Sequence, residues 1–248
     1  MVKDEFVLEE LNEELRILQP QSGYRFSLDA VLLARFPVIR EGYKIIDLGT
    51  GSGVIPLLLS TRAKNLFIQG VEIQPRLAEL ARRNVALNNL QGKITVLEGD
   101  LKFLPKEMNG QWDLVVSNPP YFKVKAGKLG QEEKAIARHE LKCSLADVIT
   151  CGAKLLKPRG HLALVHRIER LPELINLLAQ VRLTPWRLLF VHPKRDKQGE
   201  LFLLEAVKGT ALSLKLLPPL IIYDESGQYT PELKRIYAGC DIQEGGEF

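Results

Sequence analysis

The sequence contains few cysteines and histidines, and it has no long apolar run. Its three cysteines, Cys143, Cys151 and Cys240, are odd in number and form no CxxC pair, so neither a disulfide framework nor a zinc knuckle is encoded. The four histidines lack ligand spacing, and we predict no metal site. No stretch approaches the roughly 18 apolar residues that span a bilayer, and the opening MVKDEFVLEE is acidic, unlike a leader peptide. We therefore expect a cytoplasmic protein with reduced thiols and no membrane contact.

Neither sign of charge is in large excess. The chain has 34 Lys and Arg residues against 30 Asp and Glu residues, which gives a net charge of +4. This mild basic excess permits an anionic partner without requiring one. With 46% hydrophobic residues over 248 positions, the chain is long enough to bury a sizeable core.

From Lys44 onward, short apolar runs alternate with segments of helical periodicity, which is typical of βα units wound on a parallel sheet. The expected strands cover residues 44–48, 66–72, 94–97, 112–117 and 161–166. The expected helices cover residues 54–62, 75–88, 145–156 and 171–181, with one more at 27–36 and another that begins at Thr230. Near-continuous apolar runs are expected of strands that are covered on both faces. We therefore predict one main α/β domain.

The last two expected strands, 186–192 and 200–207, are joined by only seven residues, PKRDKQG. A parallel crossover needs a dozen or more residues, so this pair must be antiparallel. A mostly parallel seven-stranded sheet that ends in an antiparallel hairpin resembles the Rossmann-like fold of class I S-adenosylmethionine-dependent methyltransferases. Nicotinamide dehydrogenases, whose strands are all parallel, resemble it less.

On this basis we divide the chain into three parts. Residues 1–43 form an N-terminal strap and helix, with Ser27 as a candidate N-cap. Residues 44–208 form the methyltransferase domain, and residues 209–248 form a C-terminal appendage of the same domain.

A glycine-rich turn follows the first strand of the main domain. Residues 47–53 read DLGTGSG, with Gly49, Gly51 and Gly53 at i, i+2 and i+4. The dinucleotide fingerprint requires its third glycine at i+5, where this chain has Val54, so pyrophosphate recognition is disfavoured. Without Cβ atoms, the backbone amides could approach a carboxylate or a ribose closely.

Carboxylates end three successive strands. Asp47 precedes the glycines and would suit a ligand with a positive charge, such as a sulfonium or an ammonium. Glu72 lies 25 residues later, where a carboxylate can accept both ribose hydroxyls. Asp100 follows the third strand and could accept a hydrogen bond from an adenine amino group. Together the three residues predict a nucleoside-like cofactor with a cationic group.

The tetrapeptide Asn118, Pro119, Pro120 and Tyr121 follows the fourth strand. The amino nitrogen of adenine, or an amide nitrogen, is a poor nucleophile because its lone pair is delocalised. The side-chain oxygen of Asn118 and the carbonyl of Pro119 could each accept one N–H and concentrate electron density on that nitrogen. The prolines restrict the backbone, and Tyr121 offers a face on which a base can stack.

These motifs together resemble class I methyltransferases that modify amino nitrogens. The segments QPQSGYRFSLDAVLLARF, ARHE and LPPLIIYDESGQYTPELKRIY narrow the resemblance to the bacterial tRNA1(Val) adenine-N6-methyltransferase family, over nearly the whole chain. The resemblance implies S-adenosylmethionine as cofactor and the anticodon-loop adenosine of tRNA Val as substrate. The candidate cofactor residues are Asp47, Gly49, Gly51, Gly53, Glu72, Ile73, Asp100, Leu101 and Asn118, and the candidate catalytic residues are Asn118, Pro119, Pro120 and Tyr121.

A basic segment, residues 122–143, follows the tetrapeptide and carries six basic and three acidic side chains. Lysines and arginines in such a loop could attract phosphates, while the pocket selects the base. A solvated loop whose lysines serve solubility is the alternative. The candidate substrate-binding residues are Tyr121, Phe122, Lys123, Lys125, Arg138, His139 and, in the N-terminal strap, Arg25.

Two other functions stay open at the level of sequence. The same site could methylate a protein glutamine or a ribosomal RNA base, although about 43 residues before the first strand are too few for the helical substrate-binding domain of release-factor methyltransferases. A non-catalytic RNA-binding protein with a vestigial cofactor pocket is the second alternative. We expect tRNA as partner, no obligate protein partner, and a monomer or weak homodimer.

Overall fold

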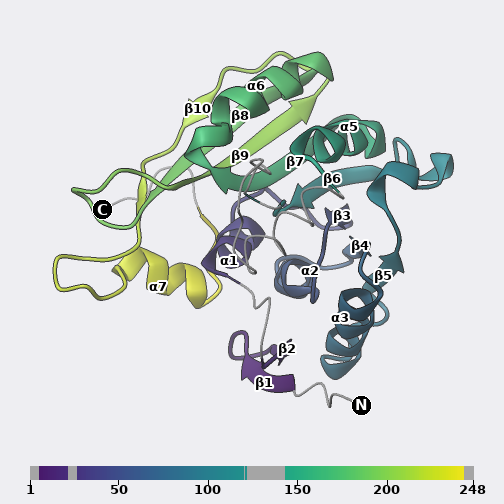
Figure 1. Ribbon diagram of the computed structural model, residues 1–248, viewed down its shortest axis with the longest axis horizontal. Helices are drawn as coiled ribbons and strands as arrows, with labels where there is room; N and C mark the ends of the chain where they lie inside the picture. The colour runs from purple at the N-terminus through teal and green to yellow at the C-terminus, as the bar shows by residue number, and fades with distance from the viewer. Residues whose placement is uncertain (1–5, 22–26, 120, 122–142, 243–248) are drawn as a thin grey trace, which may run out of the picture.

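The computed structural model describes residues 6–21, 27–119, 121 and 143–242 of the chain. They form a nine-stranded sheet with helices on both faces and a separate two-stranded hairpin (Figure 1). Five strands are parallel and lie in the order β7-β6-β3-β4-β5. They are β3 (Lys44–Leu48), β4 (Phe67–Glu72), β5 (Ile94–Glu98), β6 (Trp112–Ser117) and β7 (Leu156–Arg167). The direction of winding changes between β3 and β6, and open α/β sheets bind ligands at the carboxyl ends of strands beside such a point.

The predicted antiparallel pairing of the strands at 186–192 and 200–207 is confirmed. Strand β9 (Leu201–Lys208) runs antiparallel to both β7 and β8 (Leu183–His192). The sheet is wider than the seven strands expected, because β10 (Lys215–Leu216) and β11 (Leu220–Ile221) each pair in parallel with β8. A strand of two residues has no periodicity to recognise, which is why the sequence did not reveal them.

Each face of the sheet is covered by its own set of helices. The cluster of buried residues on one face includes side chains of α1 (Leu28–Arg35), α2 (Val54–Ser60), α3 (Pro75–Leu87) and α7 (Pro231–Tyr237). The cluster on the other face includes α5 (Leu145–Leu155) and α6 (Leu171–Gln180), and Figure 1 shows these two helices across the sheet from α1 and α2. Successive residues of a strand point to opposite faces, so Ile45 lies in the first cluster and Ile46 in the second. Both faces of β3 are therefore buried, as its apolar sequence predicts.

The N-terminal hairpin was not predicted. It pairs β1 (Phe6–Glu10) with β2 (Arg16–Pro20), and β2 lies along α3. The side chains of Asn84 and Asn88 bond the backbone of β2 as a neighbouring strand would: each carbonyl oxygen accepts an N–H and each amide donates to a carbonyl. Two asparagines on a helix therefore fix a segment that sequence periodicity alone does not place.

The ends of two helices follow the sequence signals. Ser27 is the N-cap of α1 by its extended backbone, although its side chain makes no capping bond. Thr230 is the N-cap of α7, and its hydroxyl accepts the N–H of Leu233 at 3.3 Å. In the described ranges, every helix is too short or too polar to cross a bilayer. The boundaries at 43/44 and 208/209 stay predictions.

Candidate active site

The glycine turn after β3 is held to β4 by backbone hydrogen bonds. The amides of Gly49 and Thr50 both donate to the carbonyl of Val71, at 2.9 and 3.0 Å. Gly49 and Gly51 have φ angles of 81° and 58°, in the left-handed region that L side chains rarely adopt. The turn therefore depends on glycine at these positions.

Glu72 fixes this turn from the end of β4. Its side chain is buried, its Oε2 accepts the N–H of Gly51 at 2.9 Å, and its Oε1 accepts the N–H of Gln74 at 2.9 Å. A carboxylate oxygen can accept more than one hydrogen bond. Glu72 can therefore hold the glycine turn and still accept the hydroxyls of a ribose, the role expected from the sequence. Ile73 follows it and is partly buried.

Asp47 is fully buried below the same turn. Neither of its carboxylate oxygens has a hydrogen-bond partner among the described residues, and the Thr50 hydroxyl is also unpartnered there. Burial, together with the charge of Glu72, raises the pKa of Asp47 to about 7. A buried carboxylate without a partner is costly, so the site favours a ligand that brings a positive charge or hydrogen-bond donors.

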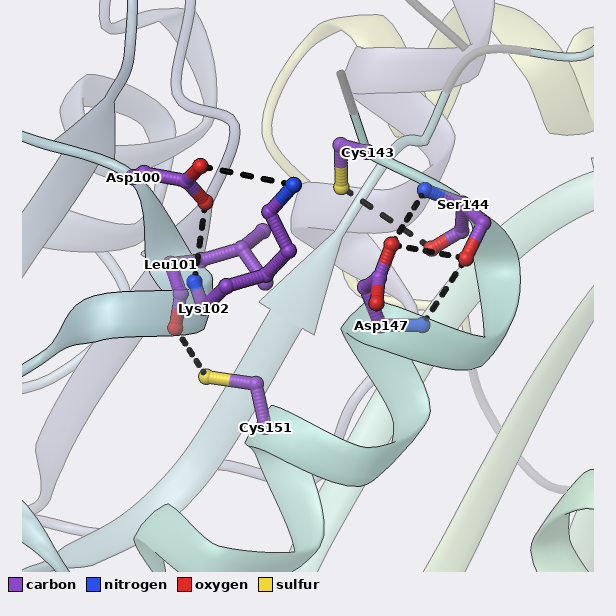
Figure 2. A network of polar contacts seen from close by, with 7 residues as sticks. All are labelled: Asp100, Leu101, Lys102, Cys143, Ser144, Asp147 and Cys151. Atoms are coloured by element: carbon purple, nitrogen blue, oxygen red, sulfur yellow. Dashed lines mark hydrogen bonds and ion pairs between the residues drawn. The ribbon is translucent and has the colours of Figure 1, made fainter. Parts of the chain in front are cut away.

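Asp100 follows β5 and is the N-cap of a short 3-10 helix, η1 (Leu101–Phe103). Its Oδ1 accepts the N–H of Lys102 at 2.9 Å, and the Lys102 ammonium lies 3.5 Å from Oδ2 (Figure 2). The Leu101 carbonyl accepts the thiol hydrogen of Cys151, at 3.2 Å, which joins η1 to α5. Asp100 therefore lies on a fixed backbone that α5 supports.

The start of α5 forms the second network in Figure 2. Ser144 and Asp147 form a capping box, in which each side chain accepts the backbone N–H of the other. Cys143 precedes it, and burial raises the pKa of its thiol to about 12. This cysteine is therefore a neutral thiol at physiological pH and not a nucleophile.

The tetrapeptide after β6 lies beside the glycine turn. The Ser117 hydroxyl donates to the carbonyl of Leu48 at 2.7 Å, which ties the end of β6 to the end of β3. The Tyr121 hydroxyl lies 2.8 Å from Asn118 Oδ1 and 2.5 Å from Oδ2 of Asp29, a residue of α1. The described members of the tetrapeptide, Asn118, Pro119 and Tyr121, thus stand at the carboxyl edge where the switch of winding occurs.

The chain is similar to known methyltransferases over most of its length. Residues 28–180 match the model of the methyltransferase small domain family. A tRNA1(Val) (adenine(37)-N6)-methyltransferase of Porphyromonas gingivalis is 35% identical over 227 residues, 88% of this chain and 89% of the relative. One of Parabacteroides distasonis is 31% identical and covers 90% of this chain and 93% of the relative. The chain belongs to this family of methyltransferases.

Solved structures agree on the fold. A predicted O-methyltransferase of Agrobacterium tumefaciens superposes with a TM-score of 0.71 at 24% identity, over 87% of this chain and 98% of that one. A geranyl diphosphate methyltransferase in complex with S-adenosylmethionine has a TM-score of 0.55 at 15% identity, over 71% of this chain and 82% of that one. At these identities the likeness establishes the class I methyltransferase fold and not the substrate.

S-adenosylmethionine is the cofactor of this methyltransferase, and the site fits it. The unpartnered carboxylate of Asp47 suits a cationic ligand, and a Cβ at Gly49 would have no described atom within 4 Å apart from those of its two chain neighbours. Residues that would hold the cofactor are Asp47, the glycine turn, Glu72 and Asp100. The specific contacts of these residues, and those of Ile73 and Leu101, stay predictions.

Several predicted residues lie outside the described part of the chain. They are Arg25, Pro120, Phe122, Lys123, Lys125, Arg138 and His139. The candidate substrate surface is thus described only at Tyr121, where the ring packs against the buried ring of His166 with a centroid distance of 5.2 Å.

Three residues of the site were not predicted. Asp29 contacts Tyr121 from 92 positions away, and Asn84 donates to the Ser52 carbonyl of the glycine turn at 2.9 Å while it bonds β2. A Cβ on Gly70 would lie 2.8 Å from the Thr50 side chain, so this strand glycine makes room for the turn. A glycine inside an apolar strand was the one signal available, since it often marks a close backbone approach.

Proposed function

We propose that this methyltransferase transfers a methyl group from S-adenosylmethionine to N6 of the adenosine at position 37 of a tRNA Val. The observation that carries the proposal is the position of Asn118 and Pro119, directly after β6 and joined to the end of β3 through Ser117. An amino group bound there would lie next to the glycine turn that receives the cofactor. The relatives that match most of the chain carry this activity in their names.

The two acceptors in the tetrapeptide suit an amino group with two hydrogens. Asn118 Oδ1 and the Pro119 carbonyl would each accept one N–H, so the nitrogen lone pair is drawn out of conjugation with the ring. When bound, S-adenosylmethionine supplies a methyl carbon activated by the positive charge on sulfur. The nitrogen gains the methyl group as the carbon–sulfur bond breaks and leaves the neutral thioether S-adenosylhomocysteine, and the nitrogen loses one proton to solvent. This stabilisation grows as the nitrogen becomes tetrahedral, so it acts mainly in the transition state.

Tyr121 would support the base. Its ring is held by His166 on one side and its hydroxyl by Asp29 and Asn118, so it is a rigid stacking surface. Stacking on an aromatic side chain contributes about 1 to 3 kcal/mol per base. An adenosine in an anticodon loop is already unpaired, which makes its extrusion less costly than flipping from a duplex.

The test uses isotope-labelled S-adenosylmethionine and unmodified total tRNA. The purified protein is incubated with both, the tRNA is digested, and the labelled nucleoside is identified by mass spectrometry. We expect labelled N6-methyladenosine. Unlabelled tRNA from a protein that binds the cofactor in calorimetry would contradict the proposal and direct the search to a protein glutamine or ribosomal RNA.

We further propose that the protein acts in the cytoplasm as a monomer or weak homodimer. The support for the cytoplasm is the tRNA substrate that the names of the relatives give. Light scattering at micromolar concentration should give a mass near the 27.9 kDa of one chain, and a stable higher mass would contradict it.

A further inference from the structure

Asp29 is the one charged residue among the described side chains that is bonded to the tetrapeptide. It lies in the first turn of α1, and its Oδ2 is 2.5 Å from the Tyr121 hydroxyl. The same hydroxyl is 2.8 Å from Asn118 Oδ1. Three side chains from two distant segments therefore meet at a single hydroxyl group.

A hydroxyl has one hydrogen and two acceptor lone pairs. Of the two oxygens that surround the Tyr121 hydroxyl, the Asp29 carboxylate is the stronger acceptor, because hydrogen bonds to ionised groups are shorter and stronger. The hydrogen is therefore donated to Asp29. The tyrosine oxygen then presents a lone pair to Asn118, and two facing oxygens would repel each other.

We propose that Asp29 is a positioning residue that sets the orientation of the Asn118 amide through the Tyr121 hydroxyl. A half-turn of the amide places its NH2 group against the tyrosine oxygen, to which it donates. Oδ1 is then free to face the substrate amino group. The inference rests on the proposed function, because it assumes that Asn118 Oδ1 accepts an N–H from the substrate.

The surroundings of Tyr121 support this assignment. His166 packs on the ring, and burial lowers the pKa of this histidine to about 4, so it is neutral at physiological pH. Its Nδ1 accepts the backbone N–H of Arg167 at 2.8 Å, which leaves the ring hydrogen on Nε2. Phe202 packs behind it. The tyrosine ring thus packs on a neutral histidine, and Asp29 brings a charged group to its hydroxyl.

The first test is kinetic and uses Asp29→Ala, Tyr121→Phe and the double variant. Loss of the positioning bond should lower kcat for methyl transfer roughly tenfold, the effect of one hydrogen bond, with the cofactor Kd unchanged. In the Tyr121→Phe background, Asp29→Ala should cause no further loss, because Asp29 acts only through the hydroxyl. Asp29→Asn, which keeps an acceptor oxygen, should retain more activity than Asp29→Ala.

Asp113→Ala is the matched control. Asp113 also bonds a distant segment, through the backbone N–H of Lys44 at 2.8 Å and the Lys157 ammonium at 2.7 Å, but it lies at the opposite end of β6. This variant should keep kcat. The proposal is overturned if Asp29→Ala has the kcat of the unchanged protein, or if it lowers kcat by the same factor with and without the Tyr121 hydroxyl.

A second test needs no substrate and therefore separates this proposal from the proposed function. In ¹⁵N-labelled protein, the side-chain amide signals of Asn118 are assigned by their absence in Asn118→Ala. They should shift in both Asp29→Ala and Tyr121→Phe and stay in place in Asp113→Ala. Signals that do not respond to Asp29→Ala contradict the proposal, whatever the enzyme methylates. Absence of methyl transfer to tRNA, with shifted signals, contradicts only the substrate.

Discussion

Several side chains that we propose for cofactor binding also have a structural role. Glu72, which we propose accepts the ribose hydroxyls, also bonds Gly51 and Gln74. Asp100 lies at the same edge of the sheet and caps η1. Asp47 differs because its oxygens have no partner among the described residues. Changes at Glu72 or Asp100 would thus alter the backbone as well as a contact, whereas changes at Asn118 and Asp47 can be interpreted in chemical terms.

Asn118→Ala should separate catalysis from cofactor binding. The acceptor oxygen acts on the substrate nitrogen, so its loss should lower kcat by about 100- to 1000-fold, as with one preorganised hydrogen-bonding group in an oxyanion hole. The Kd for S-adenosylmethionine should change little. Single-turnover kinetics and calorimetry measure the two quantities. A variant that no longer binds the cofactor would show that Asn118 has a different role.

Cofactor affinity should depend on the ionisation of Asp47. The pKa of about 7 for Asp47 lies above the roughly 3.9 of an aspartate in the unfolded chain. The protonated form therefore stabilises the fold below about pH 4, and this contribution to the free energy of unfolding is lost as the pH rises through 7. A cationic ligand favours the ionised form. Binding should therefore tighten between pH 5.5 and 7 and release protons.

Calorimetry at pH 6.5 in two buffers of different ionisation enthalpy measures this proton release. Asp47→Asn, which cannot ionise, should bind more weakly and lose the part of the release that comes from Asp47. Equal proton release from the variant and the unchanged protein would contradict the assignment.

At the scale of elements, the parallel strands and most helix limits could be predicted, because they depend on local periodicity and on signals at helix starts, such as Pro75 in the first turn of α3 and the N-cap Thr230 of α7. The hairpin of β1 and β2 could not. Its position depends on Asn84 and Asn88, whose polarity reads in the sequence as an exposed helix face. The short strands β10 and β11 exist only because the edge of β8 pairs with them.

The two asparagines of α3 should differ in their effect on cofactor binding. Asn84→Ala removes bonds to Leu18 and to the Ser52 carbonyl in the glycine turn, and it leaves buried groups unpaired. We expect a loss of roughly 1 to 3 kcal/mol in the free energy of unfolding and weaker cofactor binding. Asn88→Ala removes the more exposed bonds to Arg16 and is the matched control.

Urea unfolding and calorimetry on both variants check this prediction. Asn88→Ala should lose less stability and keep the cofactor Kd. An Asn84→Ala protein that binds the cofactor as tightly as Asn88→Ala would show that the hairpin and the glycine turn are not coupled through this residue.

At the scale of the whole molecule, Arg187 of β8 joins segments that are far apart in the sequence. Its guanidinium is buried, donates to Glu205 and to the carbonyl of Phe36 at 2.9 Å, and reaches the carbonyl of Ile242 at 3.3 Å. Arg187 thus joins the end of α1, the antiparallel pair of β8 and β9, and the C-terminal segment. Asp29 likewise reaches Tyr121 through tertiary structure, so neither contact could be predicted from local patterns.

Arg187→Met should destabilise the fold as a whole. It leaves the buried Glu205 carboxylate without the guanidinium, although His161 Nδ1 still lies 2.6 Å from its Oε1. Removing one member of a buried ion pair costs about 3 to 5 kcal/mol. Arg187→Met with Glu205→Gln should recover part of that loss, because no unpaired charge stays buried. Urea unfolding of the single and double variants measures both. A single variant within about 1 kcal/mol of the unchanged protein would contradict this account.

The function that we propose for this chain is methylation of N6 of adenosine 37 in a tRNA Val, with the acceptors of its tetrapeptide. The most direct measurement compares two tRNA Val transcripts, one with adenosine and one with guanosine at position 37, using labelled S-adenosylmethionine and both the unchanged protein and Asn118→Ala. We predict label only in the adenosine transcript with the unchanged protein, and only a trace with the variant. Equal labelling of both transcripts, or full activity of Asn118→Ala, would contradict the account.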